Sequence, residues 1–202
     1  MTIFEENSIV AENLVPMAAI AYQKEKVENA ICFFAKEHQK KTRSPLFQTY
    51  LYKYLSFLDL DSVKDTGRPA LGLTYQALPK GPVPIEIYRN KEKIESRCFR
   101  VKRYGENFVF ISTGDPDLSF FSKYEIKCMM RLVEIYANKF VKSKEMSEAS
   151  HQEIPAWGKT KQKDFIKYES QFDDDLKKKS AKDLNLAEEG FLIYQALEKA
   201  IK

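Results

Sequence analysis

Residues 53–88 read KYLSFLDLDSVKDTGRPALGLTYQALPKGPVPIEIY, and this stretch decides the fold. Its first part belongs to an apolar stripe with helical spacing, formed by Leu51, Tyr54, Leu55 and Leu58. The spacing predicts a helix that buries this stripe. Ser44-Pro45 can open the helix, because serine accepts a backbone N–H and proline at the first helical position needs no donor. We expect the helix to end near Asp65, before Gly67 and Pro69.

The second part of the stretch is rich in glycine and proline. Residues 71–78 alternate only loosely between turn signals, so we expect short extended or irregular structure there. The run Gly81-Pro82-Val83-Pro84 fixes the backbone twice, because each proline holds its own φ and biases its predecessor away from the helical region. Pro84 can then open a short helix through Ile85, Ile87 and Tyr88.

Outward from this stretch, most segments have helical spacing. A helix is predicted from Lys24, and a capping box at Ser122 and Glu125 opens another. Pro155 can begin a further turn of helix, and a last amphipathic helix carries Phe191, Tyr194, Leu197 and Ile201. The clearest β signal is a hairpin, with strands at 98–103 and 108–112 around a turn at 104–107. The fold class is therefore α+β: a predominantly α-helical single domain with a small β-hairpin or sheet.

Composition limits the class of protein. The chain has 202 residues, of which 44% are hydrophobic and 13% aromatic, enough for a core without a disulfide or metal. Cys32, Cys98 and Cys128 are widely spaced, which is typical of buried free thiols in a reducing compartment. The start of the chain, Met1–Asn7, is acidic, and no apolar run is long enough for a membrane span. We therefore expect a cytoplasmic protein that does not bind a membrane.

Catalytic and cofactor motifs are not found in the sequence. Neither His38 nor His151 lies in a known nucleophile context, and the adjacency of Ser150 and His151 does not aim the imidazole at the hydroxyl. The cysteines and histidines lack metal-ligand spacing, and the glycines form no phosphate-binding loop. We expect a protein that is not an enzyme and carries no cofactor or metal.

Charged residues gather in two places that could bind a partner. The basic cluster lies within residues 89–103 and consists of Arg89, Lys91, Lys93, Arg97, Arg100, Lys102 and Arg103. It is either a solvated face or a surface for an acidic protein or nucleic acid. The acidic run Asp173, Asp174 and Asp175 would suit a basic partner.

The opening stretch resembles the Panacea antitoxin domain, also described as SocA-like or GepA-like. That family has K-L-L-Y-F-A-D on a helix, a Gly-Arg-Pro turn, Tyr-x-Ala and G-P-V-P; Ser56 stands here where tyrosine is usual. Phe121-Ser122 before a long helix, and Ser150-His151 before Trp157, are similar to its second half. The similarity covers roughly residues 27–168. The matching positions include Lys53, Asp59, Thr66, Gly67, Arg68, Pro69, Tyr75, Gly81, Pro82, Val83, Pro84, Tyr88, Ser150, His151 and Trp157.

The resemblance implies a bacterial or phage-encoded antitoxin of a type II toxin–antitoxin pair, which neutralises a co-encoded toxin by direct binding. Some relatives are linked to proteolytic delivery of the toxin, so a protease is a further partner to consider. The alternative is a nucleic-acid-binding protein that recognises its own operator DNA through the basic cluster. We divide the chain into an N-terminal extension (1–23), the Panacea domain (24–168) and a C-terminal helical extension (169–202).

We expect the motif residues to build the scaffold and the extensions to select the toxin. Deletion of residues 1–23, or of the segment after Gln171, should then abolish neutralisation and leave a folded core. Within the scaffold, Arg68 could pair with Asp59 or Asp61 and hold the corner after the helix. A direct toxin contact from residues 80–88 remains a second possibility.

Overall fold

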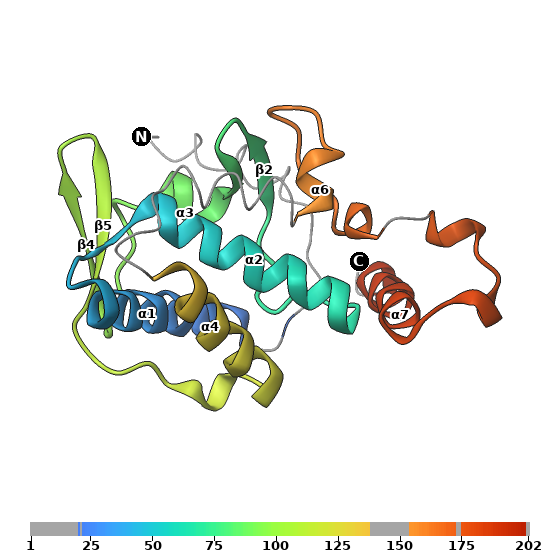
Figure 1. Cartoon of the computed structure of the whole chain (residues 1–202), viewed down its shortest axis with the longest axis horizontal. Coiled ribbons are helices and arrows are strands. Elements are labelled where there is room, and N and C mark those ends of the chain that lie inside the picture. Colours follow the sequence, from blue (N-terminus) through green and yellow to red (C-terminus); the bar gives the residue numbers. More distant parts are fainter. Residues whose placement is uncertain (1–19, 21, 138–153, 173–174, 201–202) are drawn as a thin grey trace, which may run out of the picture.

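The computed structural model describes residues 20, 22–137, 154–172 and 175–200. Helix α2 (Gln48–Thr66) runs through the middle of the molecule (Figure 1). Residues 51–60 of this helix are all buried, so the buried surface is wider than the predicted stripe. Apolar and aromatic side chains lie on every face of α2, which is the pattern of a helix enclosed on all sides. The other elements are arranged around it.

Two helices pack beside α2: α1 (Gln23–Thr42) and α4 (Lys123–Tyr136). Stacked rings join them to it, Phe34 against Tyr54 at 4.7 Å and Phe57 against Tyr136 at 5.1 Å between centroids. The capping box predicted for α4 is confirmed. The three free cysteines are buried, as expected. None of the helices within the described residues is long and apolar enough to cross a membrane.

The predicted start of α2 at Ser44-Pro45 is wrong. A short strand, β1 (Leu46–Phe47), follows the proline, and the helix begins only at Gln48 with extended Phe47 as its N-cap. Leu46 is fully buried and pairs with Phe110 of β5 (Asn107–Ser112). Strand pairing and burial therefore override the local capping signal. At its other end α2 stops at Thr66, close to the prediction.

The fold is α+β and mostly helical, and the described residues form two small antiparallel sheets. In the first, β1, β5 and β4 (Phe99–Tyr104) are neighbours in that order, and the β4–β5 hairpin is the predicted one. In the second, β2 (Tyr75–Leu78) pairs with β3 (Gly81–Pro84), so the GPVP run is a strand. Helix α3 (Ile85–Asn90) follows Pro84 as expected. The 3-10 helix η1 (Leu118–Phe120) precedes α4.

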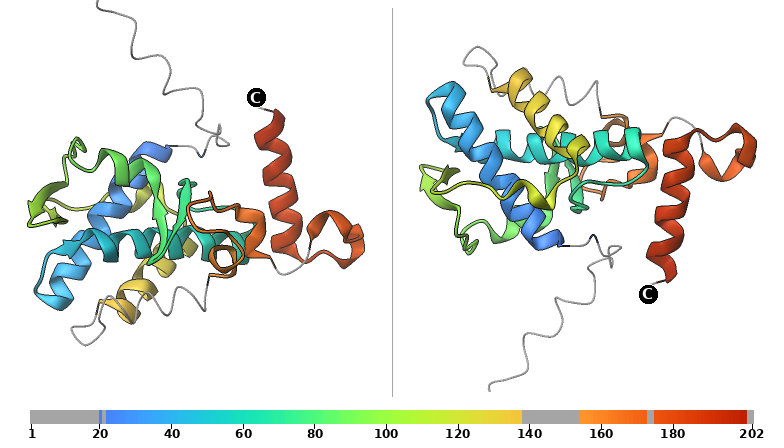
Figure 2. Two further views of the ribbon diagram at one scale, coloured as in Figure 1. Left: turned by 90° about the horizontal axis from the view of Figure 1, so that it is seen from above. Right: turned by 90° about the horizontal axis from the view of Figure 1, so that it is seen from below.

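The C-terminal part forms a second, smaller core against the end of α2. This part of the chain contains α6 (Pro155–Gly158), whose Ala156 is buried in the main core, the 3-10 helices η2 (Tyr168–Gln171), η3 (Leu176–Lys178) and η4 (Ala181–Asp183), and α7 (Leu186–Ala200). The buried members of this core are Val63, Phe172, Leu176, Ala187 and Phe191. Figures 1 and 2 show α7 standing at one end of the molecule, beside the C-terminus of α2.

The apolar residues predicted for the last helix are buried to different extents. Phe191 is buried and Tyr194 is partly buried, whereas Leu197 is 57% exposed. The expectation that Leu197 belongs to the buried face is therefore wrong. The physical reason is that α7 contacts α2 around Ala187 and Phe191, near its own N-terminus, and its C-terminal half extends away from α2 (Figure 2). Ile201 lies outside the described residues.

Candidate functional site

The carboxylate of Asp59 organises the loop that follows α2. Asp59 is completely buried, and its two oxygens accept the backbone N–H groups of Leu71 (2.5 Å), Gly72 (3.1 Å) and Leu73 (3.1 Å). The loop from residue 67 to 74 therefore wraps around this one side chain. Burial raises the pKa of Asp59, and the backbone hydrogen bonds act in the opposite direction.

Two tyrosine hydroxyls complete the surroundings of Asp59. Tyr75 donates to Asp59 Oδ2 at 2.9 Å, and its hydroxyl lies 2.8 Å from the carbonyl oxygen of Leu55. The hydroxyl of Tyr168 lies 3.3 Å from Asp59 Oδ2 and 2.6 Å from the carbonyl oxygen of Leu73. The network thus joins α2, the loop after it, β2 and η2 within the core.

The predicted pairing of Arg68 with Asp59 is wrong. Arg68 is exposed, whereas Asp59 is enclosed by backbone and tyrosine donors. Asp61 forms an ion pair with Arg131 of α4, at 3.1 Å. The corner is held instead by one backbone hydrogen bond and one side-chain hydroxyl: the N–H of Gly67 donates to the carbonyl of Val63, and Thr66 Oγ1 donates to the carbonyl of Ser62.

The tight turn between β2 and β3 is held by two side chains from distant parts of the sequence. Lys53 Nζ donates to the carbonyl oxygen of Lys80 at 2.8 Å, and Trp157 Nε1 donates to that of Leu78 at 3.1 Å. Lys53 is only 2% exposed, an uncommon position for a lysine. On the open side of β2, the segment 163–166 adds further backbone hydrogen bonds to Tyr75 and Ala77.

Gly67 ends α2 in a backbone conformation that favours glycine. Its φ is +78°, in the left-handed region, where a side chain is disfavoured. The space beside it is also closed, because a Cβ at this position would meet the backbone of Ala187, Gly190 and Phe191 in α7. Gly67 therefore both turns the chain and lets α7 approach the end of α2.

Comparison with protein families shows that the family described as antitoxin SocA-like, Panacea domain, matches residues 51–158. The chain belongs to the SocA-like Panacea family. The match begins in α2 and ends in α6, so it contains Asp59 and the β2–β3 hairpin with both side chains that hold its turn. Comparison with curated proteins and with solved structures gave no match.

Most of the described motif positions of this Panacea protein are inside the fold or in its turns. Pro69, Gly81, Pro82 and Pro84 are buried, Val83 and Thr66 are partly buried, and Tyr75 is 1% exposed. Tyr88 is different: it is 42% exposed, and its ring contacts both the ring of Tyr52 and the Nζ of Lys91. Ser150 and His151 lie outside the described residues.

The arginines of the basic cluster are exposed, and within strand β4 Arg100 and Arg103 lie on opposite sides of the sheet. Arg89, Arg97, Arg100 and Arg103 are all exposed. Lys91 Nζ lies 4.2 Å from the centroid of Tyr88 and 5.2 Å from that of Phe108. Since Phe108 pairs with Arg103, this contact brings the end of α3 to the tip of the β4–β5 hairpin. In the acidic run, Asp175 is exposed and pairs with Lys178, while Asp173 and Asp174 lie outside the described residues.

Two residues that take part in the Asp59 network and in the contact between α2 and α7 were not identified from the sequence. Tyr168 ends the segment of resemblance, yet nothing in its surroundings indicates a contact with Asp59, 109 residues earlier. Gly190 lies inside an amphipathic helix, and its spacing from Gly67 carries no periodic signal. A mid-helix glycine is itself a clue, because it costs helix stability unless close packing requires it.

His38, Cys32 and Cys128 are buried, and burial shifts the pKa of each. His38 is buried with its Nδ1 3.0 Å from the hydroxyl of Tyr54, and burial lowers its pKa to about 4. Burial raises the pKa of the Cys32 thiol to about 12 and also raises that of Cys128. Within the described part of the chain, no group of three or more His, Cys, Asp or Glu residues could hold a metal ion.

Lys53 gives a pH-dependent prediction. Burial lowers its pKa from 10.5 to about 8, so between these values the unfolded chain binds more protons than the folded one. The free energy of unfolding contributed by Lys53 should therefore increase as the pH rises through this window. Relative to Lys53→Met, the natural protein should gain about 2 kcal/mol between pH 7 and pH 9.5.

Urea denaturation of both proteins across this pH range measures the effect. The comparison with the methionine variant cancels the titration of the tyrosines, which both proteins share. A difference between the two free energies that stays constant with pH would show that Lys53 titrates like a solvated lysine.

Proposed function

We propose that this protein is an antitoxin that neutralises a co-encoded toxin by binding it directly and covering its active surface. Membership of the SocA-like Panacea family is the observation that carries the proposal. The burial of Lys53, Asp59 and Tyr75 supports a binding role rather than a catalytic one, because these side chains hold the backbone and do not face a substrate. The protein would act in the cytoplasm of a bacterium, with no cofactor.

The toxin-binding surface is proposed to lie on exposed side chains outside the Asp59 network. The basic cluster would suit an acidic face of the toxin, and the acidic run around Asp175 would suit a basic active site. Charge reversal of a cluster tests each surface without touching the core. The triple variant Arg89→Glu, Arg100→Glu, Arg103→Glu should weaken toxin binding at least tenfold if the basic cluster is used.

Co-expression with the product of the neighbouring gene tests the function itself. If that product arrests growth, this protein should restore growth and copurify with it. Growth restored without copurification would instead favour an indirect mechanism. If growth is not restored and the two proteins do not copurify, the proposal is wrong. Faster degradation of the toxin in the presence of this protein, measured after translation is stopped, would add the role of proteolytic adaptor.

A second candidate function is binding to operator DNA. The contact of Lys91 with Tyr88 and Phe108 favours it, because this contact places the basic end of α3 beside Arg103, on one side of the hairpin. Such a surface binds phosphates with an affinity that falls steeply as salt increases. A mobility shift of the protein's own promoter at low salt, lost at high salt, would support this function. The absence of a shift at low salt would exclude it.

A further inference from the structure

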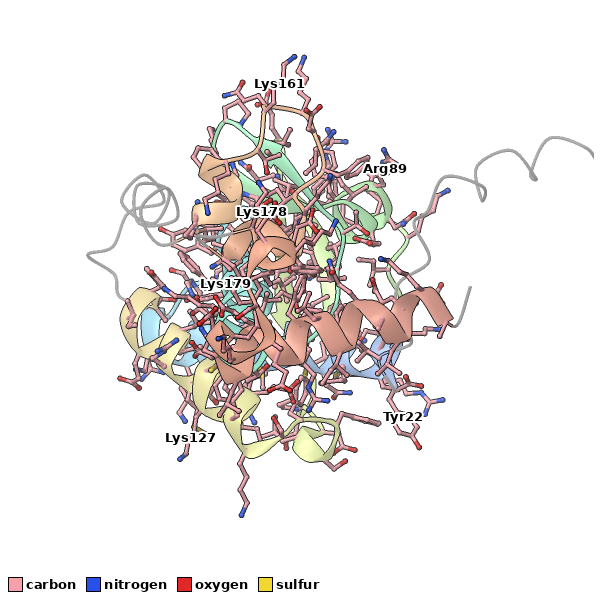
Figure 3. The ribbon with its side chains drawn as sticks, turned by 90° about the vertical axis from the view of Figure 1, so that its right-hand side faces the viewer. Tyr22, Arg89, Lys127, Lys161, Lys178 and Lys179 are labelled. Atoms are coloured by element: carbon pink, nitrogen blue, oxygen red, sulfur yellow. The ribbon has the colours of Figure 1, made fainter. Side chains whose placement is uncertain are left out.

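A pocket of about 340 Å³ lies between the first half of α1, helix α3 and the chain that leads from α3 into β4. This volume is within the range of sites that bind small molecules. Figure 3 shows Tyr22, which precedes α1, and Arg89 of α3 on the same side of the molecule. The apolar part of the wall consists of Val27, Ile31, Leu73, Ile87, Ile94 and Phe99.

One wall of the pocket is fixed by the loop that Asp59 holds. Gln23, which lines the pocket, donates from Nε2 to the carbonyl oxygens of Leu71 at 2.8 Å and of Gly72 at 3.0 Å. The N–H groups of these two residues donate to Asp59. Leu73 of the same loop faces the pocket as part of its lining. The buried aspartate of the family motif therefore also shapes this wall, and the pocket is formed in advance of any ligand.

Two carboxylates in the lining are held by different segments of the chain. Glu86 Oε1 accepts the backbone N–H of Thr74 at 2.9 Å, just before β2. Glu28 Oε1 accepts from Ser96 Oγ at 2.7 Å and from the N–H of Arg97 at 3.1 Å, after α3. The pocket thus has two fixed negative positions.

The second oxygen of Glu86 lacks a donor. Glu86 Oε2 is buried and has no hydrogen-bond partner among the described residues. A buried oxygen of this kind is costly, and more so when it carries charge. The last torsion of a glutamate side chain is soft, so a small rotation of the carboxylate can bring Oε2 to the pocket that Glu86 lines. A ligand that donates a hydrogen bond would therefore remove this cost.

The charge of the lining favours a ligand with two positive charges. Together with Glu95, the lining residues carry three carboxylates against the single ammonium of Lys24, a formal charge of −2. The start of this chain has the wrong charge to fill the pocket, because residues 1–20 contain three glutamates and no lysine or arginine. The complementary ligand is a separate cation with an apolar body.

From the apolar walls, the two held carboxylates and the oxygen without a donor, we propose that this pocket binds an aliphatic diamine. One ammonium donates to Glu86, the other lies near Glu28 and Glu95, and the methylene chain packs against the apolar walls. A ligand with so few atoms should bind with a dissociation constant on the order of 0.1–1 mM. The proposal does not depend on the proposed function, because this binding is a property of the chain alone.

An NMR titration of the nitrogen-15-labelled full-length protein with 1,5-diaminopentane tests the proposal. The amide signals of Thr74, Glu86 and Ser96 should shift and saturate. 1,5-Pentanediol, which has the same length and no charge, should cause no saturable shift. No saturable shift with the diamine up to about 10 mM, or shifts only outside the pocket, would overturn the proposal. Equal affinity for Nα-acetyl-lysine methylamide would show that one ammonium is enough, and the assignment of a diamine would be wrong.

Conservative variants test the role of each carboxylate. Glu86→Gln keeps an acceptor for Thr74 but removes the charge, so it should weaken diamine binding at least about tenfold. Glu95 is exposed, so Glu95→Gln leaves the core untouched and should weaken binding about threefold. Glu92→Gln is the matched control, because Glu92 is exposed and is not part of the lining, and it should change nothing. Equal affinities for all three variants would show nonspecific attraction of a cation and would contradict the assigned site.

Discussion

Replacement of Asp59 by alanine should lower the free energy of unfolding by about 3–5 kcal/mol, because each buried donor that loses its acceptor costs roughly 1–3 kcal/mol. The substitution removes the acceptor for the N–H groups of residues 71–73 and for the Tyr75 hydroxyl. These donors are buried, so water would not replace the carboxylate without opening the core. The loss is a large share of the roughly 5–15 kcal/mol that a typical domain has in total.

The matched control for this prediction is Asp61→Ala. Asp61 is in the same helix, two residues further on, and its side chain pairs with Arg131, which is 54% exposed. An exposed pair of this kind contributes less than about 1 kcal/mol. Chemical denaturation of the two variants, with the free energies compared at one pH, measures the contrast. Equal losses for both variants would show that burial and the loop hydrogen bonds of Asp59 are not the source of its effect.

The same residue shows how far the sequence could predict the structure. The family resemblance marks Asp59 as a motif position, and the pattern around it correctly predicts α2 and the turn at Gly67. Its partners were assigned wrongly, because Arg68 is close in sequence and opposite in charge. The observed donors are backbone N–H groups, which every residue carries, so no side-chain pattern distinguishes them.

Predictions based on local chemistry succeeded where no distant segment competed. The capping box of α4 and the β4–β5 hairpin depend on neighbours within a few residues, and both are confirmed. The cap at Ser44 failed because Leu46 pairs with β5, more than sixty residues away in the chain. The exposed position of Leu197 has a related cause: helical spacing predicts an apolar side, but the extent of its burial depends on how much of α7 reaches α2.

Gly67→Ala should also have a large effect, because it tests the contact between the Panacea domain and α7. The new Cβ would lie 2.5 Å from the backbone nitrogen of Phe191 and 2.7 Å from the carbonyl carbon of Gly190. Such distances are too short, and the backbone atoms of α7 cannot rotate away as a side chain would. We expect α7 to leave its place, exposing Phe172 and Phe191 of the second core. The free energy of unfolding should fall by about 3–5 kcal/mol, from this overpacking and the left-handed φ together.

Gly105→Ala separates the two contributions. Gly105 has a φ of +61°, similar to that of Gly67, but nothing lies within 4 Å of the position its Cβ would take. It should therefore show only the backbone cost, about 1–2 kcal/mol. Limited proteolysis should cleave Gly67→Ala faster between residues 175 and 186, and leave Gly105→Ala at the natural rate. If both variants lost the same free energy and resisted protease equally, close packing at Gly67 would not be what holds α7 against α2.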